Sequence, residues 1–251
     1  MTTLLSKWLI VNISLDEIFQ MAGASAIKTF VEIGANDGKK NDPLYHYIVK
    51  YGWTGILVEP DPANFKKLKA NYQAHDGLIF ENTGIGPERG EMPFYKIKDI
   101  SDREPGWYDQ VGSFDKKTFL KNITFGQGLD QRMIEVPLPV IGFDELLEKN
   151  NFGTPDLLHL DAEGFDFRIL RSIDFKKYQI RLVLFESEWM TKSELKELIQ
   201  YLMNHQYRIV RSGIDYAGIK NNDSTIKGLW KKALSLIITT LIGCCILNEQ
   251  R

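Results

Sequence analysis

Short apolar runs alternate with helical patterns along the first third of the chain, and this alternation limits the fold more than any other feature of the sequence. Apolar and β-branched residues fill three short runs, 29–33, 55–59 and 78–82, and each run is expected to form a strand. A helical pattern lies between each pair of runs. Strands that alternate with single helices form a parallel sheet with right-handed crossovers, so the sequence predicts an α/β fold.

Two Asp-Pro pairs mark the expected starts of these helices. We expect Asp42 and Asp61 to cap the helices, with Pro43 and Pro62 at the first helical position, where the missing N–H is not needed. Apolar residues at helical spacing follow the first pair, and Gly52 is expected to end that helix.

The same pattern returns in the second half after an interruption. Residues 98–134 are polar with scattered aromatic side chains, and we expect an irregular lid or substrate-binding segment there. Asp144 is then expected to cap a short helix. The further expected elements are a strand at 156–161, a helix at 164–172, a strand at 180–186, a helix at 192–203 and a hairpin of 207–210 with 216–219. The predicted fold is a Rossmann-like, mostly parallel sheet with helices on both faces and an antiparallel closing hairpin.

Length, charge and cysteine usage narrow the class of protein. The chain has 251 residues and a formal net charge of −2, with no long basic run. This length suits one domain, and the charge disfavours a nucleic-acid partner and favours a small-molecule or glycan substrate. The 2 cysteines are neighbours at 244 and 245, which excludes a disulfide framework and indicates a cytoplasmic location. The sequence carries no signal for the oligomeric state.

The two ends of the chain differ from the predicted domain at 29–227. Residues 1–28 are expected to pack against the domain, whereas 228–251 form an apolar tail with an uncharged run at 233–247. As a helix this run would reach about 22 Å, less than the roughly 30 Å of a bilayer core. Two interpretations stay open: a terminal element packed on the domain, or membrane association through residues 229–247.

Acidic residues and glycines follow the ends of the predicted strands, where open parallel sheets bind ligands. The first cluster runs Glu32-Ile-Gly34-Ala-Asn36-Asp37-Gly38, and its glycines allow a sharp turn and a close approach to a ligand. Asn36 stands where a dinucleotide-binding loop has its middle glycine, which argues against a pyrophosphate cradle. An acid followed by two glycines at this spacing is typical of S-adenosylmethionine sites.

A second acid lies at the end of the next predicted strand. Glu59 follows Gly38 by 21 positions, close to the spacing of about 20 at which this fold places an acceptor for ribose hydroxyls. The alternative is that Glu59 binds no ligand and is only a solvated acid at the end of a strand.

The expected strand at 156–161 carries the candidates for the reaction centre. Alternation puts His159 and Asp161 on one face, and Glu163 follows in the loop. Each could take a proton from an attacking alcohol, and Asp161 is the first choice because strand-end acids face the crevice. The three could hold a divalent cation only with further ligands, so no metal ligand is assigned. The alternative for His159 is a structural role in the core. The alternative for Glu163 is an acid at the start of a helix, where the helix dipole favours a negative charge.

Four segments resemble FkbM-type methyltransferases: FVEIGANDG, GWTGILVEPDPANFKKLKANY, HLDAEGFDFRILRSIDF and RLVLFE. The resemblance extends from about residue 29 to 186. It implies a class I Rossmann-like enzyme that transfers the methyl group of S-adenosylmethionine to a hydroxyl of a sugar or other small molecule.

The resemblance also implies roles for single residues. Glu32, Gly34 and Gly38 would hold the methionine moiety, and Glu59 the ribose. Asn82 would lie beside the adenine. The acidic turn at Asn36-Asp37 departs from many relatives, which leaves open whether Asp37 contacts cofactor or substrate. Two rival functions are a nicotinamide-dependent oxidoreductase and a non-catalytic scaffold tethered by its tail.

Overall fold

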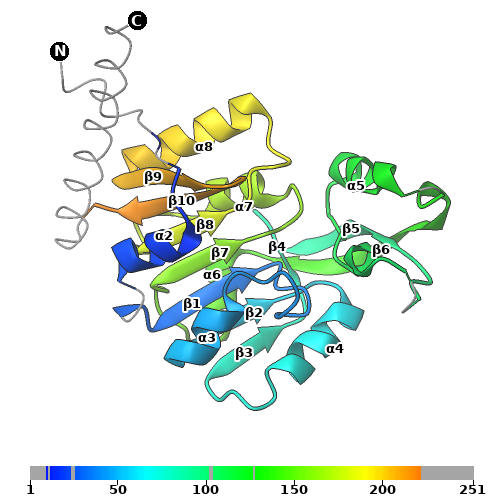
Figure 1. Cartoon of the computed structure of the whole chain (residues 1–251), viewed down its shortest axis with the longest axis horizontal. Coiled ribbons are helices and arrows are strands. Elements are labelled where there is room, and N and C mark those ends of the chain that lie inside the picture. The colour runs from blue at the N-terminus through cyan, green and yellow to red at the C-terminus, as the bar shows by residue number, and fades with distance from the viewer. Residues whose placement is uncertain (1–9, 11, 24–25, 102–103, 127, 222–251) are drawn as a thin grey trace, which may run out of the picture.

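The computed structural model describes residues 10, 12–23, 26–101, 104–126 and 128–221. These residues form a large sheet with helices on both faces, and a smaller sheet beside it (Figure 1). The predicted tail at 228–251 lies outside the described residues. So do residues 1–9, 11 and 24–25 of the predicted N-terminal segment. Within the described ranges, no helix combines the length and the apolar character needed to cross a bilayer.

The large sheet confirms the predicted α/β class. Its strands are β1 (Thr29–Ile33), β2 (Thr54–Val58), β3 (Leu78–Glu81), β7 (Leu157–Leu160), β8 (Leu182–Phe185), β9 (Tyr207–Ser212) and β10 (Asp215–Lys220). They lie in the order β3-β2-β1-β7-β8-β10-β9. The first five in this order pair in parallel, and β10 is antiparallel to both of its neighbours. The predicted hairpin is therefore present, with its second strand inserted between β8 and β9.

Helices cover both faces of this sheet (Figure 1). One apolar core contains strand residues together with side chains from three helices and from residues that flank them. These helices are α2 (Leu15–Ala22), α3 (Tyr45–Tyr51) and α4 (Pro62–Asn71). The other contains strand residues with α6 (Phe143–Lys149), α7 (Asp166–Ser172) and α8 (Lys192–Asn204). Neighbouring strand residues point to opposite faces, so Phe30 joins the first core and Val31 the second.

The two Asp-Pro pairs behave differently. Asp61 caps α4 as predicted, and its side chain accepts the N–H of Ala63. The prediction for Asp42 was wrong, because α3 begins at Tyr45 and Leu44 precedes it as the cap residue. Asp42 instead forms a turn before the helix, in which its Oδ1 accepts the N–H groups of Leu44 and Tyr45 at 2.6 and 3.2 Å.

Two further helix ends can be compared with the sequence. Gly52 ends α3 in the left-handed region, with φ +61°, as predicted. The cap predicted for Asp144 was wrong: α6 begins after Gly142, and Asp144 lies in its first turn, where it pairs with Lys177 at 2.7 Å.

A second structural unit lies between the halves of the sheet in sequence. Its elements are β4 (Gly84–Ile85), β5 (Gly90–Ile97), β6 (Met133–Ile141), α5 (Lys116–Asn122) and the short 3-10 helices η2 (Gly106–Asp109), η3 (Ile123–Phe125) and η4 (Asp130–Arg132). We call residues 90–141 the insert. It extends beyond the large sheet as the green unit in Figure 1 and has a small core of its own, which includes Tyr95, Ile97 and Phe119.

The sequence predicts an irregular segment at 98–134, and the structure differs there. That stretch contains α5, the short helices and the start of β6. Its function as a lid or substrate-binding segment stays a prediction.

Candidate functional site

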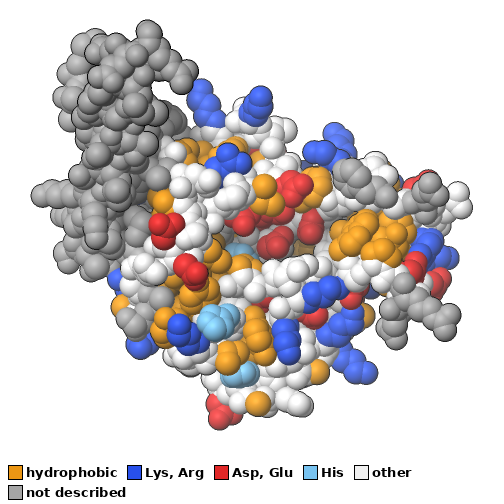
Figure 2. All heavy atoms as spheres, viewed as in Figure 1, with side chains coloured by type: hydrophobic (Ala, Val, Ile, Leu, Met, Phe, Trp, Pro, Cys, Tyr) orange, Lys and Arg blue, Asp and Glu red, His pale blue; other side chains and the backbone are white. Residues whose placement is uncertain are grey.

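A cavity opens at the carboxyl ends of β1, β2 and β7, between the large sheet and the insert. The cavity and its open mouth together hold about 980 Å³ of space. Its lining includes five carboxyl side chains: Glu32, Asp42, Glu59, Asp161 and Glu163. Figure 2 shows acidic side chains gathered around a hollow in the middle of this face. Strand-end acids that are far apart in sequence thus meet in one place.

Glu32 is the most deeply buried of these acids, with 2% of its surface exposed. Its Oε1 lies 2.9 Å from Nδ1 of His159 on the neighbouring strand β7. Its Oε2 accepts no hydrogen bond from a donor among the described residues when the neighbouring Asp42 carboxyl is ionised. Burial raises the pKa of Glu32 to about 8. A hydrogen bond with the side chain of Asp42 opposes this rise, and the Asp161 carboxylate adds to it. A buried, unpaired acceptor at the base of a cavity fits a donor group of a ligand.

Gly34 follows β1 and has a left-handed backbone, with φ +85°. A Cβ atom at this position would lie 1.8 Å from the carbonyl oxygen of Asp161. The glycine is therefore required by the close approach of the loops after β1 and β7, and it lines the cavity through its backbone.

Gly38, the second glycine of the motif, lies outside the lining of this cavity. It has φ +68°, and a Cβ there would meet Leu68 at 2.3 Å and Tyr72 at 2.6 Å. Its contacts fix the loop against α4, and direct contact with the methionine moiety stays a prediction.

Glu59 lies at the end of β2 and is 5% exposed. Its two oxygens accept backbone N–H groups, Oε2 from Asn36 at 2.9 Å and Oε1 from Asp61 at 2.8 Å. Burial raises the pKa of Glu59 to about 8. Each carboxylate oxygen has two lone pairs, so both retain capacity for a ligand hydroxyl. Glu59 thus holds two loops together and faces the cavity.

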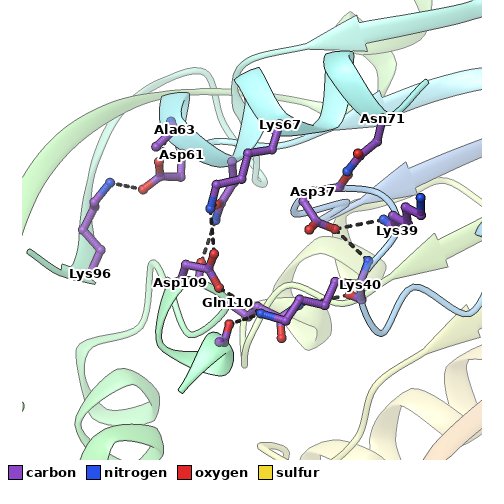
Figure 3. A network of polar contacts seen from close by, with 12 residues as sticks. Asp37, Lys39, Lys40, Asp61, Ala63, Lys67, Asn71, Lys96, Asp109 and Gln110 are labelled. Carbon is purple, nitrogen blue, oxygen red and sulfur yellow. Dashed lines mark hydrogen bonds and ion pairs between the residues drawn. The ribbon is translucent and has the colours of Figure 1, made fainter. Parts of the chain in front are cut away.

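Three other predicted cofactor residues shape the loops near Glu59. Asn36 lines the cavity with a left-handed backbone, φ +49°. Asp37 accepts the N–H groups of Lys39 and Lys40 at 2.9 and 2.8 Å, and its side chain turns to this local contact (Figure 3). Neither Asp37 nor Asn82 belongs to the cavity lining.

Asn82 fixes the loop after β2. Its amide donates to the carbonyl oxygens of Glu59 at 2.8 Å and Pro60 at 3.0 Å. Its predicted place beside the adenine stays a prediction, as does a ligand contact of Asp37.

Strand β7 and the loop after it bring the predicted catalytic residues into the same cavity. His159, Asp161 and Glu163 all line it. Asp161 is open to the cavity, yet the surrounding protein and the Asp166 carboxylate raise its pKa to about 7. Burial and the neighbouring Asp161 raise the pKa of Glu163 to about 8. Carboxyls with such pKa values can take up a proton near neutral pH.

The sequence assigned no role in the site to two further acids near this loop. Asp42 lines the cavity, and burial together with Glu32 raises its pKa to about 8. Its Asp-Pro context was explained by helix capping, which hid the second role. Glu186 follows β8, and burial with several neighbouring carboxylates raises its pKa far above the usual range. Its position at the end of the predicted strand 180–186 was the available signal.

The insert is attached to the cavity wall through Asp109 and Gln110, next to η2 (Figure 3). Asp109 Oδ2 pairs with Lys67 of α4 at 2.6 Å, and Oδ1 lies 3.5 Å from Nζ of Lys40. The backbone carbonyl of Asp109 accepts from Asn64 at 2.6 Å. Gln110 donates to the carbonyl of Lys40 at 3.0 Å. Lys40 and Gln110 both line the cavity, so these contacts close one of its sides.

A second attachment joins β5 to the start of α4. Lys96 forms an ion pair with Asp61, the residue that caps α4 (Figure 3). The two attachments hold the insert over the loops that carry Glu59 and Asn36.

Metal ligands are not grouped in the part of the chain that the structure describes. There, no three His, Cys, Asp or Glu side chains are arranged to hold a metal ion. A cation in the reaction therefore stays a hypothesis, to which we assign no residues.

The strand order and the position of the cavity define the class of protein. An otherwise parallel sheet with one antiparallel strand inserted before the last, and a ligand cavity at the carboxyl ends, is the architecture of class I Rossmann-like methyltransferases. Residues 32–209 match the model of the methyltransferase FkbM domain family. The chain belongs to this family, whose cofactor is S-adenosylmethionine.

Solved structures resemble the chain at low sequence identity. The FkbM methyltransferase from Methylobacillus flagellatus KT is 12% identical, with a TM-score of 0.48, and the match covers 78% of this chain and 44% of that one. The chain thus spans less than half the length of that protein. The N-terminal domain of human METTL16 in complex with SAH is 13% identical, with a TM-score of 0.43, 83% of this chain covered and 69% of that one. No curated protein sequence matches the chain.

Proposed function

We propose that the protein is an S-adenosylmethionine-dependent methyltransferase that methylates a hydroxyl group of a small molecule or glycan. The observation that carries this proposal is the acidic cavity with the unpaired Oε2 of buried Glu32 at the carboxyl ends of β1 and β7. S-adenosylmethionine carries a sulfonium and an ammonium group, and a carboxyl-lined cavity complements this positive charge. Family membership supports the same cofactor.

The lining residues fit the parts of the cofactor. Glu32 would accept from the ammonium group, beside the backbone of Gly34, and Glu59 would accept from the ribose hydroxyls. When bound, S-adenosylmethionine supplies a methyl group on a positively charged sulfur. Asp161 and Glu163, with pKa values near 7 and 8, can take the proton that an acceptor hydroxyl releases.

The acid-rich lining also distinguishes this proposal from a nicotinamide-dependent oxidoreductase. Dinucleotides bring a doubly charged pyrophosphate, which binds to backbone N–H groups and to positive charge. Five carboxyl side chains in one cavity oppose such a ligand. Asn36 in place of the middle glycine adds to that argument.

Other features bear on the kind of methyl acceptor and on the location of the protein in the cell. Phe94 and Phe114 line the cavity with ring centroids 4.9 Å apart, which supports a sugar or another ring-containing acceptor. The net charge of −2 supports an acceptor other than a nucleic acid. Cysteine usage supports a cytoplasmic location, and the run at 229–247 supports membrane association as the alternative.

Calorimetric titration tests the cofactor. We expect S-adenosylmethionine and S-adenosylhomocysteine to bind, and NAD⁺ to show no binding. Glu32→Gln removes the negative charge that would accept from the ligand ammonium group, so affinity should fall by about 10- to 100-fold, the range of a hydrogen bond to a charged group.

A second buried glutamate provides the matched control. Glu81 is 7% exposed and bonds to Lys149 and Asn150 away from the cavity, so Glu81→Gln should keep full affinity. Equal affinity in the two variants would contradict the placement of the cofactor. Methyl transfer itself is measured as S-adenosylhomocysteine formed with a panel of free sugars and nucleotide sugars. NAD⁺ binding in place of S-adenosylmethionine would favour the oxidoreductase.

A further inference from the structure

The insert has a small set of buried polar side chains with a common orientation. Among the described residues of 98–134, the buried polar ones are Ser113, Thr118 and Asn122. Ser113 precedes α5, and the other two lie on that helix. All three contact the loop after β7 at residues 163 and 164. The polar interior of the insert is therefore directed at one loop of the cavity.

Two of these contacts are hydrogen bonds to Glu163. The amide of Asn122 donates to Oε2 of Glu163 at 2.7 Å, and the hydroxyl of Ser113 donates to its backbone carbonyl at 2.7 Å. Thr118 packs against Gly164 so closely that a Cβ there would lie 2.5 Å from the threonine Oγ1. Side chain, carbonyl and the next residue of the loop are thus all fixed from the insert.

The backbone of this loop needs such support. Glu163 has φ +47° and Gly164 has φ +91°, two left-handed residues in succession. A non-glycine residue keeps this conformation when surrounding contacts hold it there. Asp161 differs, because its N–H donates to the carbonyl of Ile33 at 3.0 Å and the sheet itself sets its position.

We propose that Asn122 and Ser113 are positioning residues that hold the Glu163 carboxyl at the acceptor end of the cavity. This inference rests on the proposed methyltransferase function. Asn122 occupies Oε2 and leaves Oε1 for the acceptor. Oε1 would take the hydroxyl proton as the acceptor oxygen forms its bond to the methyl carbon. The bond from that carbon to sulfur breaks in the same step, and its electron pair stays on the sulfur of the departing S-adenosylhomocysteine. The insert thus fixes the position of the Glu163 carboxyl, whereas the large sheet fixes the position of Asp161.

The charged groups around Glu163 determine the direction in which its pKa should change when Asn122 is replaced. The charged groups that raise its pKa are carboxyls: Asp161 and Asp166 from its own loop and helix, and Glu188 from the segment after β8, where Glu186 also interacts with Glu163. A positive charge also lies near that segment, because Nζ of Lys121 on α5 is 5.1 Å from the ring centroid of Trp189. Asn122 is the hydrogen-bond donor that favours the ionised form of Glu163, and it lowers the pKa against these neighbours. Loss of this donor should therefore raise the pKa.

NMR titration of the protein with ¹³C-labelled glutamate δ-carbons measures this pKa without any acceptor, and Glu163→Gln assigns the signal. In Asn122→Leu the pKa of Glu163 should rise by about one pH unit, as expected when a hydrogen bond to the charged form is lost. Asn122→Asp preserves the shape of the side chain and adds a like charge, so it should also raise the pKa of Glu163. This variant replaces Asn122→Leu if the leucine variant does not fold. Ser113→Ala, which acts on the backbone carbonyl, should leave it nearly unchanged.

Asn150→Leu is the matched control, because Asn150 donates to Glu81 at 2.8 Å in the same manner, far from Glu163 in the fold. It should leave the pKa of Glu163 and the turnover unchanged. An unchanged pKa in both Asn122 variants would overturn the inference.

The kinetic arm uses the first acceptor that the sugar panel identifies. At pH 7, Asn122→Leu and Ser113→Ala should lower kcat by about 10-fold or more, within the range for a positioned proton-transfer group, with calorimetric affinity for S-adenosylhomocysteine retained. The acid limb of the rate profile should move to higher pH in Asn122→Leu alone. An unmoved limb and wild-type kcat would overturn the inference. Absent cofactor binding in the wild-type protein would overturn the proposed function instead.

Discussion

Gly34 shows how a single residue fixes the distance between two loops of the site. A Cβ at this position would overlap the Asp161 carbonyl at 1.8 Å, and the neighbouring atom is backbone that cannot rotate away. We expect Gly34→Ala to lower the free energy of unfolding by roughly 2–4 kcal/mol, the combined scale of a left-handed alanine and overpacking. Urea denaturation measures the change.

Gly52 supplies the control for the backbone part of that effect. It is left-handed as well, with φ +61°, but a Cβ there would meet nothing within 4 Å. Gly52→Ala should therefore cost about 1 kcal/mol, the conformational part alone. Equal losses in the two variants would mean that the contact with Asp161 is unimportant.

At the residue scale, the sequence could locate acids at the carboxyl ends of strands. Glu32 is the last but one residue of β1, and Glu59 and Asp161 directly follow β2 and β7. Parallel strands bring these ends to one edge of the sheet. Asp42 could not be found in this way, because its position before a proline had a sufficient local explanation. The contacts of Asn122 and Ser113 were also hidden, since they depend on how the insert folds onto the sheet.

At the scale of elements, β6 shows why part of the fold could not be predicted. Its sequence contains Pro137 and Pro139, which argue against a strand because proline donates no N–H to the ladder. In the structure Pro137 faces Pro93 of β5, and such a pair suits a position without ladder hydrogen bonds. Long-range pairing therefore places a strand where local composition opposes one.

The attachment of η2 provides a prediction at the same scale. Asp109→Asn preserves the shape of the side chain but removes the charge that pairs with Lys67 and Lys40. The pairs are partly exposed, so we expect less than about 1 kcal/mol of lost stability. The insert should open more often over the cavity, which should speed dissociation of S-adenosylhomocysteine and proteolytic cleavage near residues 106–110. Stopped-flow competition and timed proteolysis measure both rates.

Asp144 gives a comparable ion pair elsewhere in the molecule. It pairs with Lys177 at 2.7 Å, on the far side of the sheet from α4, and its side chain is 50% exposed, against 26% for Asp109. Asp144→Asn should leave both rates unchanged. If Asp109→Asn also leaves them unchanged, the ion pairs do not hold the insert over the cavity.

At the scale of the whole molecule, the site concentrates acidic side chains in a protein whose net charge is only −2. Glu32, Asp42, Glu59, Asp161 and Glu163 share one cavity, and burial is the largest cause of the raised pKa of each. A mostly parallel sheet could be anticipated from the alternation of strands and helices, but the order of its strands was not predicted. The degree of crowding among the acids could not be anticipated, because it depends on how the loops pack around them.

This crowding sets the sign of the pH dependence of stability. The ordinary pKa values are 3.8 for aspartate and 4.5 for glutamate, whereas in the folded protein Glu32, Asp42, Glu59 and Glu163 have values of about 8, and Asp161 of about 7. Between about pH 5 and 8 the folded state therefore binds more protons than the unfolded state. Without cofactor, the free energy of unfolding should fall as pH rises through this window.

Urea denaturation at pH 5.5, 7.0 and 8.5 measures that slope, and calorimetric titration supplies a second arm. Glu32→Gln removes one of the shifted groups, so its slope should be shallower by up to about 1.4 kcal/mol per pH unit, the limit for a single titrating group. S-adenosylmethionine is more positive than S-adenosylhomocysteine by the sulfonium charge, so its relative affinity should increase from pH 5.5 to 8.5 as the carboxyls ionise. A stability that rises with pH, or a constant ratio of the two affinities, would show that the cavity acids are already ionised at low pH and that their proximity does not select a cationic ligand.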